Sequence, residues 1–372
     1  MTSLLDTLAP VLAEGATPRV LTELATRLAA ALGGSVDVWL ADYRQVMLRS
    51  ALRGDTAAVD DSRVGRCFAS QSVLAGDAGV CVPITSRGDR VGVLEVRCPV
   101  PDTAELQTVA SLLAQLLRAL NGVTSSYERD RRRRPMTVAA ELQWALLPGQ
   151  AYADEALSVA GMLEPAYSIA GDAYDWARED DTFCLAVLDG TGRGVPAALA
   201  TTLALSALRN ARLAAVSLAD QAALTDQAIY AHYGGQFYTS ALLFEFDVRD
   251  GVARVIDAGS PMLLRQRAGR VELIELEAQL PLGMLEESLY VEQAAEIAPG
   301  DRLLIVSDGV HAAVGADGRT FGPEYIEQLL RDSRLLSAAE TARHITRELG
   351  SLHGEDGPED DAVVVCLDWR PL

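Results

Sequence analysis

The chain has 372 residues, with 52 acidic and 32 basic side chains and a formal net charge of −20. Hydrophobic residues make up 49% and charged residues 23%, which is an ordinary globular composition and excludes a disordered or fibrous chain. The length predicts two domains. The acidity argues against a nucleic acid or an anionic membrane surface as the main partner, because both would repel the chain.

Acidic residues are concentrated in the second part of the chain. Residues 149–372 contain 36 acidic and 16 basic side chains, whereas residues 1–148 contain 16 of each. Every basic residue is an arginine, so chemistry that needs a lysine, as in Schiff-base enzymes, P-loop NTPases and protein kinases, is excluded. The surplus of carboxylates leaves open the binding of divalent cations.

Cysteine usage and hydropathy predict the compartment. The five cysteines form no CxxC pair, which argues against a disulfide framework or a zinc site and favours a reducing compartment. The N-terminus lacks a leader pattern, and apolar runs are far shorter than the ~20 residues needed to span a bilayer. We therefore expect a cytoplasmic protein with no membrane partner.

Residues 1–122 are predicted to form an α/β domain. Leucines at helical spacing indicate one or two amphipathic helices within residues 3–33. Alternating apolar runs then predict four strands, at Ser35–Leu40, Gln45–Leu52, Val80–Ile84 and Val91–Val96. The turn-like sequence TSRGDR between the last two predicts a hairpin.

A long helix is predicted to follow, with Asp102 as its N-cap. Its apolar residues repeat at alternating steps of three and four, a short heptad seam formed by Leu113, Leu116, Leu120, Val123 and Tyr127. Such a seam could pack within one chain or pair two chains. Because it leaves one domain and enters the next, we favour a parallel homodimer.

Residues 123–148 are predicted to be a helical linker. It contains the basic run ERDRRRR at 128–134, which we interpret as a solvated helix surface, with a docking patch for an acidic partner as the alternative. A second short helix is predicted at Thr137–Leu147, before Pro148.

From residue 149 the pattern becomes rich in strands. They are predicted at Ser158–Glu164, Thr182–Leu188, Ser240–Val248, Ala253–Asp257, Arg302–Val306 and Ala362–Asp368. Helices are predicted between them, at Val195–Ala211, Asp220–Tyr233, Pro323–Arg331 and Ser337–Leu349. This order lacks a strict βαβ rhythm and predicts an α+β domain over 149–372, with mixed or antiparallel sheets covered by helices.

Four acidic positions stand beside apolar runs. They are Asp172 in AGDAYD, Asp189 in VLDGTG, Asp308 in IVSDGV and the pair Asp360–Asp361 before AVVVC. Asp and Gly are ordinary turn residues, so each position alone could simply end a strand. Together they indicate a cluster of hard oxygen ligands, which selects Mg²⁺ or Mn²⁺. Two such cations generate a hydroxide near neutral pH and hold phosphoryl oxygens for in-line displacement.

Eight segments carry a resemblance to a known family. They are AAELQWALLP (139–148), EPAYSIAGDAYDW (164–176), LDGTGRGVPAALA (188–200), GQFYTSALL (235–243), DAGSPMLL (257–264), LPLGM (280–284), APGDRLLIVSDGV (298–310) and DDAVVV (360–365). In this order they make residues 137–369 resemble the SpoIIE/RsbU-type branch of the PPM (PP2C) metal-dependent serine/threonine protein phosphatases. Residues 1–122 resemble a GAF sensor domain, through VGRCFASQSVL (64–74) and VPITSRGDRVGVLEV (82–96).

The resemblance implies an αββα sandwich with two Mn²⁺ or Mg²⁺ ions between its sheets. Asp189 is then expected to bridge both ions, Gly190 to offer its carbonyl oxygen to one of them, and Asp172 to serve that same side. Asp189, Asp172 and Asp308 form the expected catalytic set.

The second ion is expected to be held by Asp308 together with one residue of the final acidic pair. The family pattern favours Asp360 over Asp361 as this metal ligand. Asp175 is expected to support the site without binding metal.

The sequence departs from the family pattern at several positions. Ala170 replaces a glycine, Val363 replaces a threonine, and DAGS, with Asp257 and Ser260, replaces NAGH. Eukaryotic relatives have a histidine where Thr191 stands, so no general acid is assigned.

The predicted function is a metal-dependent protein serine/threonine phosphatase that dephosphorylates an anti-sigma-factor antagonist in a bacterial partner-switching pathway. A small-molecule or protein signal at the GAF-like domain would control it, relayed by residues 105–147 to the metal site. The alternative is a catalytically weak or inactive sensor-scaffold that binds a phosphoprotein, which the loss of NAGH would favour.

Overall fold

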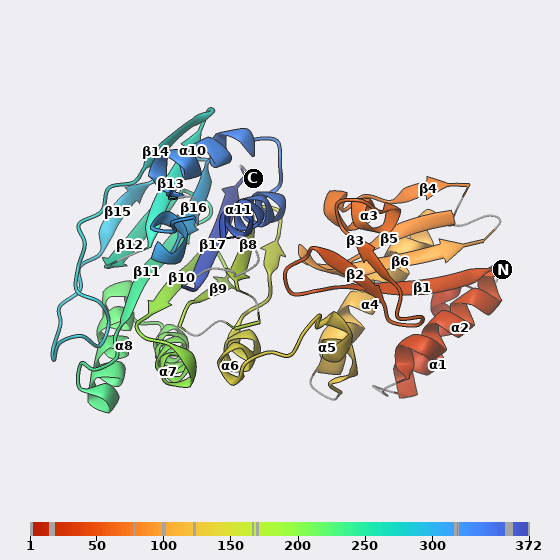
Figure 1. Ribbon diagram of the computed structural model, residues 1–372, viewed down its shortest axis with the longest axis horizontal. Helices are drawn as coiled ribbons and strands as arrows, with labels where there is room; N and C mark the ends of the chain where they lie inside the picture. The colour runs from red at the N-terminus through yellow and green to blue at the C-terminus, as the bar shows by residue number, and fades with distance from the viewer. Residues whose placement is uncertain are drawn as a thin grey trace. The chain divides into compact units, whose positions relative to one another are not determined.

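The computed structural model describes residues 3–14, 19–77, 79–98, 102–121, 124–165, 167–168, 171–259, 261–315, 318, 320–353 and 360–370. The chain divides into two compact units, Met1–Pro135 and Met136–Leu372. The predicted linker at 123–148 is thus shared between them (Figure 1).

The first unit is an antiparallel sheet with helices on both faces. The strands, in the order β3-β2-β1-β6-β5-β4, are β1 (Ser35–Ala41), β2 (Met47–Ser50), β3 (Thr56–Ala58), β4 (Leu74–Gly76), β5 (Gly79–Ser86) and β6 (Asp89–Arg97). The helices are α1 (Leu4–Glu14), α2 (Val20–Leu32), α3 (Arg63–Ser70), α4 (Thr103–Asn121) and α5 (Ser126–Arg131). Apolar side chains of α1, α2 and α4 cover one face, and those of α3 pack on the other. This architecture is consistent with a sensor domain, and the predicted hairpin is confirmed as β5–β6.

The heptad seam is a packing stripe inside the first unit. Leu113, Leu120 and Tyr127 are buried in the core formed with α1, α2 and the sheet, and Leu116 packs against that core. Val123 lies outside the described residues. The long helix ends at Asn121, as α4, and a separate helix, α5, follows. The prediction that this seam pairs two chains is therefore wrong, because its described side chains are already covered within the first unit.

The basic run is docked on the first unit. The Nε of Arg131 donates to the carbonyl oxygen of Ala41 at 3.0 Å, and its guanidinium lies 4.7 Å from the ring centroid of Tyr43. Arg133 pairs with Asp42 at 3.9 Å. The prediction of a solvated helix surface is therefore wrong for Arg131, whose side chain is only 19% exposed.

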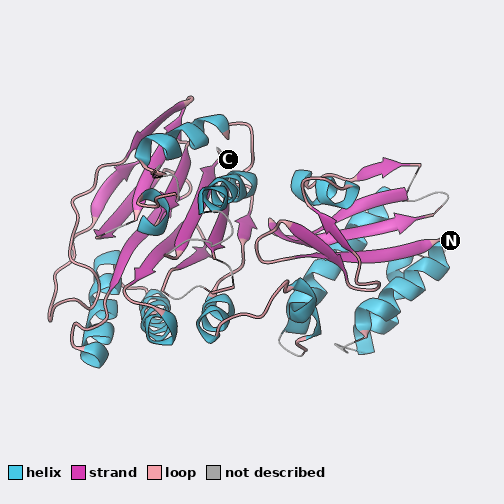
Figure 2. Ribbon diagram, in the orientation of Figure 1, coloured by secondary structure: helices cyan, strands magenta, loops and turns pink. Residues whose placement is uncertain are grey.

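The second unit consists of two stacked sheets between two layers of helix, which confirms the predicted αββα sandwich (Figure 2). The first sheet, in the order β15-β12-β11-β10-β9, contains β9 (Ala173–Glu179), β10 (Thr182–Gly190), β11 (Thr239–Asp247), β12 (Val252–Ala258) and β15 (Gln293–Glu296). The second sheet, in the order β14-β13-β16-β17-β8-β7, contains β7 (Ala151–Ala153), β8 (Leu157–Glu164), β13 (Met262–Arg267), β14 (Arg270–Leu273), β16 (Arg302–Val306) and β17 (Ala362–Trp369). The pairings between these strands are antiparallel.

The helices of the second unit lie on the outer faces of the sheets. They are α6 (Val138–Leu146), α7 (Gly194–Leu213), α8 (Leu218–Tyr233), α9 (Asp308–His311), α10 (Pro323–Asp332) and α11 (Ala338–His353). The α7 and α8 helices cover the first sheet, and α10 and α11 cover the second. The hydroxyl of Thr137 accepts from the N–H of Ala140 and so caps α6.

Alternation along β10 directs its last acid toward the space between the sheets. Leu185 and Val187 belong to the core between the two sheets, whereas Ala186 and Leu188 face the helices. Because successive side chains of a strand point to opposite faces, Asp189 continues the set that faces the second sheet.

Candidate metal centre

Two of the predicted site residues stand at one edge of the first sheet. Asp189 is the penultimate residue of β10, and Asp172 immediately precedes β9. Leu188 pairs with Ala173 across these strands, so the two acids extend neighbouring strands at the same edge. Asp172 is only 3% exposed, an unusual environment for a carboxylate.

The other two positions stand at the edge of the second sheet. Asp308 begins α9, two residues after β16, and Asp361 directly precedes β17, the neighbour of β16. Gly309 lies against the backbone of Asp361, where a Cβ would come 1.7 Å from the carbonyl oxygen of Asp361. Only a glycine allows this approach between the two loops.

The structure brings these four carboxylates together around Asp172. Burial raises the pKa of Asp172 well above its ordinary value of 3.8, and the charges of Asp189, Asp361 and Asp308 raise this pKa further. A hydrogen bond from Ser307 acts in the opposite direction. The Oδ2 of Asp172 is buried and has no hydrogen-bond partner among the residues that the structure describes. A buried carboxylate with one oxygen unpaired and like charges around it calls for a compensating proton or cation.

A serine that the sequence analysis did not single out lies beside Asp172. Ser307 is fully buried between β16 and α9, and its hydroxyl lowers the pKa of Asp172. The same hydroxyl accepts the N–H of Val363 at 2.9 Å, which links it to β17. Ser307 therefore brings a polar group of the second sheet next to Asp172 of the first.

Gly171 links the two sheets through a hydrogen bond from its backbone. Its N–H donates to the Oδ2 of Asp361 at 2.7 Å. Its carbonyl oxygen accepts from the N–H of Gly190 at 3.2 Å and from the hydroxyl of Thr201 at 2.6 Å. A Cβ on Gly190 would lie 2.4 Å from that hydroxyl, so this close backbone approach requires glycine.

The structure places Asp361, not Asp360, in the cluster. Asp360 is exposed, and its Oδ1 accepts from the N–H of Asp361. Asp361 adjoins β17 and is held by Gly171, whereas Asp360 lies one residue farther from the sheet. Asp361 thus acts on Asp172 and has one oxygen engaged by Gly171, while the preference for Asp360 as the metal ligand stays a prediction.

The donor set fits hard divalent cations bound through few protein ligands. The described part of the chain contains no group of three or more His, Cys, Asp or Glu side chains arranged around a single ion. Magnesium commonly binds through one or two carboxylates and keeps several waters, so a two-ion site does not require such a group. The carboxylates expected to hold the ions stand on both sheets, Asp189 and Asp172 on the first, and Asp308 with the Asp360–Asp361 pair on the second.

Asp175 has a structural environment and does not support the site directly. Its carboxylate is 3% exposed and pairs with Arg209 at 2.7 Å and with Arg212 at 3.1 Å, both from α7. Arg209 also donates to the carbonyl oxygen of Leu146 at the end of α6. Asp175 therefore joins β9 to α7 and α6, and its expected role beside the metal is wrong.

Two of the residues that depart from the family pattern, Thr191 and Asp257, make local hydrogen bonds. Thr191 bonds the backbone of Tyr238 through its hydroxyl, which donates to the carbonyl oxygen at 2.8 Å and accepts from the N–H at 3.1 Å. Asp257 closes its own turn by accepting from the N–H of Gly259. Ala170 and Ser260 lie outside the described residues.

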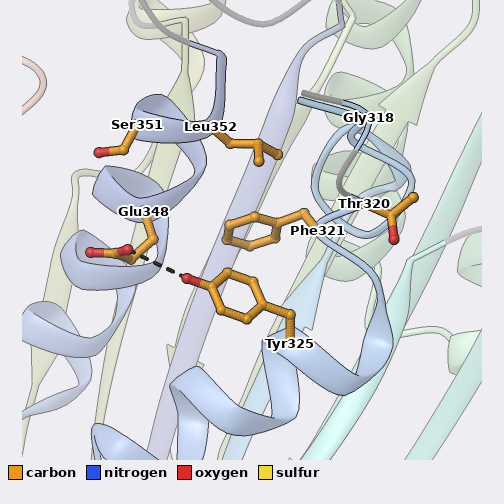
Figure 3. A pocket seen from close by; sticks show the side chains of 7 residues that line it. All are labelled: Gly318, Thr320, Phe321, Tyr325, Glu348, Ser351 and Leu352. Atoms are coloured by element: carbon orange, nitrogen blue, oxygen red, sulfur yellow. Dashed lines mark hydrogen bonds between the residues drawn. The ribbon is translucent and has the colours of Figure 1, made fainter. Parts of the chain in front are cut away.

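Two cavities in the described part of the second unit lie away from the carboxylates. One, of about 540 Å³, is lined by Phe321, Tyr325, Glu348 and Leu352 of the α10–α11 region (Figure 3). Another, of about 440 Å³, lies at the β9–β10 hairpin and has a charged lining that includes Glu179. The candidate site is identified by its buried carboxylates.

The comparisons with known proteins agree with this geometry. The family model described as Stage II sporulation protein E (SpoIIE) matches residues 179–370, more than half of the chain. This chain belongs to the SpoIIE family. It is also similar to the phosphoserine phosphatase RsbU of Bacillus subtilis (strain 168), with 21% identity over 229 residues, covering 61% of this chain and 68% of RsbU.

Solved structures share the fold of this SpoIIE-family chain. The SiaA-PP2C domain of Pseudomonas aeruginosa has a TM-score of 0.52 and 25% identity, covering 62% of this chain and 93% of that domain. The RsbU and RsbW domains of Rv1364c from Mycobacterium tuberculosis have a TM-score of 0.50 and 21% identity, covering 58% of this chain. The match spans 62% of that mycobacterial chain. The predicted resemblance is confirmed, and the second unit has the PP2C fold.

None of the helices in the described part of the chain is both long enough and apolar enough to cross a bilayer.

Proposed function

We propose that this chain is a metal-dependent phosphatase that removes phosphate from phosphoserine or phosphothreonine in a protein. The observation that supports this most directly is the burial of Asp172 among Asp189, Asp361 and Asp308. Divalent cations bound there would activate a water and neutralise the phosphoryl oxygens during displacement at phosphorus.

The chain's own residues would prepare this site. The N–H of Gly171 holds the carboxylate of Asp361, and the hydroxyl of Ser307 lies beside that of Asp172. These contacts would orient two of the four acids before substrate arrives, so that less reorganisation is needed during reaction. The glycines at 171, 190 and 309 allow the backbones to approach closely.

We infer a protein substrate of the partner-switching type, a phosphorylated anti-sigma-factor antagonist. The support is similarity to a phosphoserine phosphatase, RsbU, and to a structure that contains RsbU and RsbW domains. The five cysteines are free, as expected of a protein working in the bacterial cytoplasm. We propose Mn²⁺ or Mg²⁺ as the ions because the donors are carboxylates.

We further propose that the first unit is a GAF-like sensor for a small-molecule or protein signal. Its last helix, α5, is attached to the turn after β1 through Arg131, whereas α6 packs in the second unit and contacts α7 through Leu146 and Arg209. A signal could thus pass along residues 105–147. A homodimer would need a surface other than the buried Leu113–Tyr127 stripe.

Hydrolysis of an aryl phosphate by the full chain tests the proposal. We expect hydrolysis that needs Mn²⁺ and stops with a chelator, that is lost in Asp189→Asn and Asp308→Asn, and that persists in the control Asp332→Asn on α10. Full turnover in both site variants would contradict the site. Absence of chelator-sensitive turnover, with retained binding of a phosphoprotein, would favour the sensor-scaffold alternative.

A further inference from the structure

A segment without regular secondary structure lies between the helix layer and the metal-site edge of the first sheet. It follows β14 and leads to β15, and its central residues 281–284 lie beside α8 (Figure 1). Gly283 has a φ of +82°, and a Cβ there would lie 2.3 Å from Cγ2 of Ile229 on α8. The segment is therefore packed directly on this helix.

A buried aspartate of α8 fixes this segment. Asp226 is fully buried, and its Oδ1 accepts from the N–H of Gly283 at 2.7 Å and from the hydroxyl of Tyr290 at 3.0 Å. Its Oδ2 is buried and has no hydrogen-bond partner within the described ranges. Burying a carboxylate with one oxygen unpaired costs free energy, so a purely structural explanation of this residue is incomplete.

The fixed segment in turn holds the strand next to the metal site. Leu282 and Thr239 exchange two backbone hydrogen bonds, each of 2.9 Å. Thr239 is the register partner of Gly190 in the β10–β11 pair. Asp226 is therefore connected to Gly190 through two backbone pairings only.

We propose that Asp226 is a positioning residue for the metal centre. By holding residues 282–283 against Thr239, it sets the position of Gly190, whose carbonyl oxygen the family resemblance assigns to a metal ion. This inference rests on the proposed function. It gives a role to this carboxylate, which is buried on the face of α8 that also buries Gln221 and Thr225.

Direct measurement of Mn²⁺ binding by calorimetry on the full chain tests this role. Asp226→Ala removes the acceptor for both hydrogen bonds, and we expect the Kd for Mn²⁺ to rise about tenfold or more, as for other residues that orient metal ligands. Asp226→Asn keeps an acceptor oxygen and should remain within about threefold of the wild type. Tyr290→Phe, which removes one of the two bonds, should lie between them.

A matched control separates positioning from loss of stability. Ile345→Ala removes buried apolar atoms from α11, on the other sheet, and should lower the Tm while leaving the Kd for Mn²⁺ unchanged. A folded Asp226→Ala variant with the wild-type Kd overturns the inference. If Asp226→Ala does not fold, Tyr290→Phe decides, and a Kd equal to that of Ile345→Ala overturns it. If the wild type itself binds no Mn²⁺, the proposed function fails. If the wild type binds Mn²⁺ and a folded Asp226→Ala variant binds it equally well, only the role of Asp226 fails.

Discussion

Replacing Asp172 by asparagine should stabilise the metal-free protein and destabilise the manganese-loaded protein. In the metal-free protein this carboxylate is 3% exposed, and burial and the charges of Asp189 and Asp361 raise its pKa. Asparagine keeps an oxygen that can accept from Ser307 but carries no charge. The substitution therefore removes a repulsion that is otherwise offset by a proton on Asp172 or by a bound cation.

The magnitude follows from proton linkage. Because the folded-state pKa of Asp172 lies above its unfolded-state pKa, the folded protein retains a proton that the unfolded chain releases, and the free energy of unfolding falls as pH rises between the two pKa values. Each unit of difference is worth about 1.4 kcal/mol. For a domain of this size, 1 kcal/mol corresponds to about 2–4 °C in Tm. Each unit should thus give Asp172→Asn an advantage of roughly 3–6 °C in chelator at about pH 7.5.

Manganese should reverse this order. Ions at a hundred times their Kd stabilise a folded protein by about 2.7 kcal/mol, and Asp172→Asn should lose most of this gain. Thermal unfolding of both proteins is measured with chelator and with MnCl₂. Repeating it at about pH 4 and about pH 7.5 separates the effect of the charge on Asp172 from the effect of bound manganese. Two results together would refute the reasoning. Asp172→Asn would be no more stable than the wild type in chelator at the higher pH, and the difference in stability between the two proteins would not change with pH.

Three further outcomes are expected. Asp361→Asn should reduce the kcat for an aryl phosphate by about 10²-fold or more, whereas Asp360→Asn should stay within about threefold; equal losses would contradict the assignment of Asp361. Asp175→Asn should lower the free energy of unfolding by about 3 kcal/mol in a urea titration, because two arginines of α7 lose their buried partner, and a loss under about 1 kcal/mol would mean that water replaces it. Arg131→Ala should lower the stability of the first unit by about 1 kcal/mol through a lost hydrogen bond and ring contact, with the second unit's unfolding transition unchanged in calorimetry.

The sequence predicts the strands that carry the site because their apolar runs are long and end in polar turns. β16 has the predicted bounds, and β10 and β17 extend beyond the prediction by at most two residues. Asp189 and Asp308 were located by this pattern. The different surroundings of Asp360 and Asp361 could not be predicted in the same way, since they depend on a hydrogen bond from Gly171, which is 190 residues away in the chain.

Other features escaped prediction because their meaning is set by tertiary contacts. The Leu113–Tyr127 stripe has the spacing of a coiled coil, but the core of the first unit uses the same spacing for intramolecular packing. Ser307 and Asp226 act through bonds to residues distant in the chain, and the sequence contains no periodic signal for these bonds. β9 was missed because its sequence, AYDWARE, mixes buried and charged side chains.

The attachment of α5 and α6 to different units leaves very little free chain between them. Arg131 is bonded to Ala41, and the N–H of Thr137 donates to the carbonyl oxygen of Tyr167, so the intervening backbone spans at most roughly 20 Å when fully extended. A connection this short becomes taut after a small displacement of one unit from the other. It also transmits a rotation of one unit to the other better than a long flexible linker does. Inserting a few glycines would lengthen the connection without changing either core. It would show whether the sensor-like unit controls the second unit by pulling on this connection.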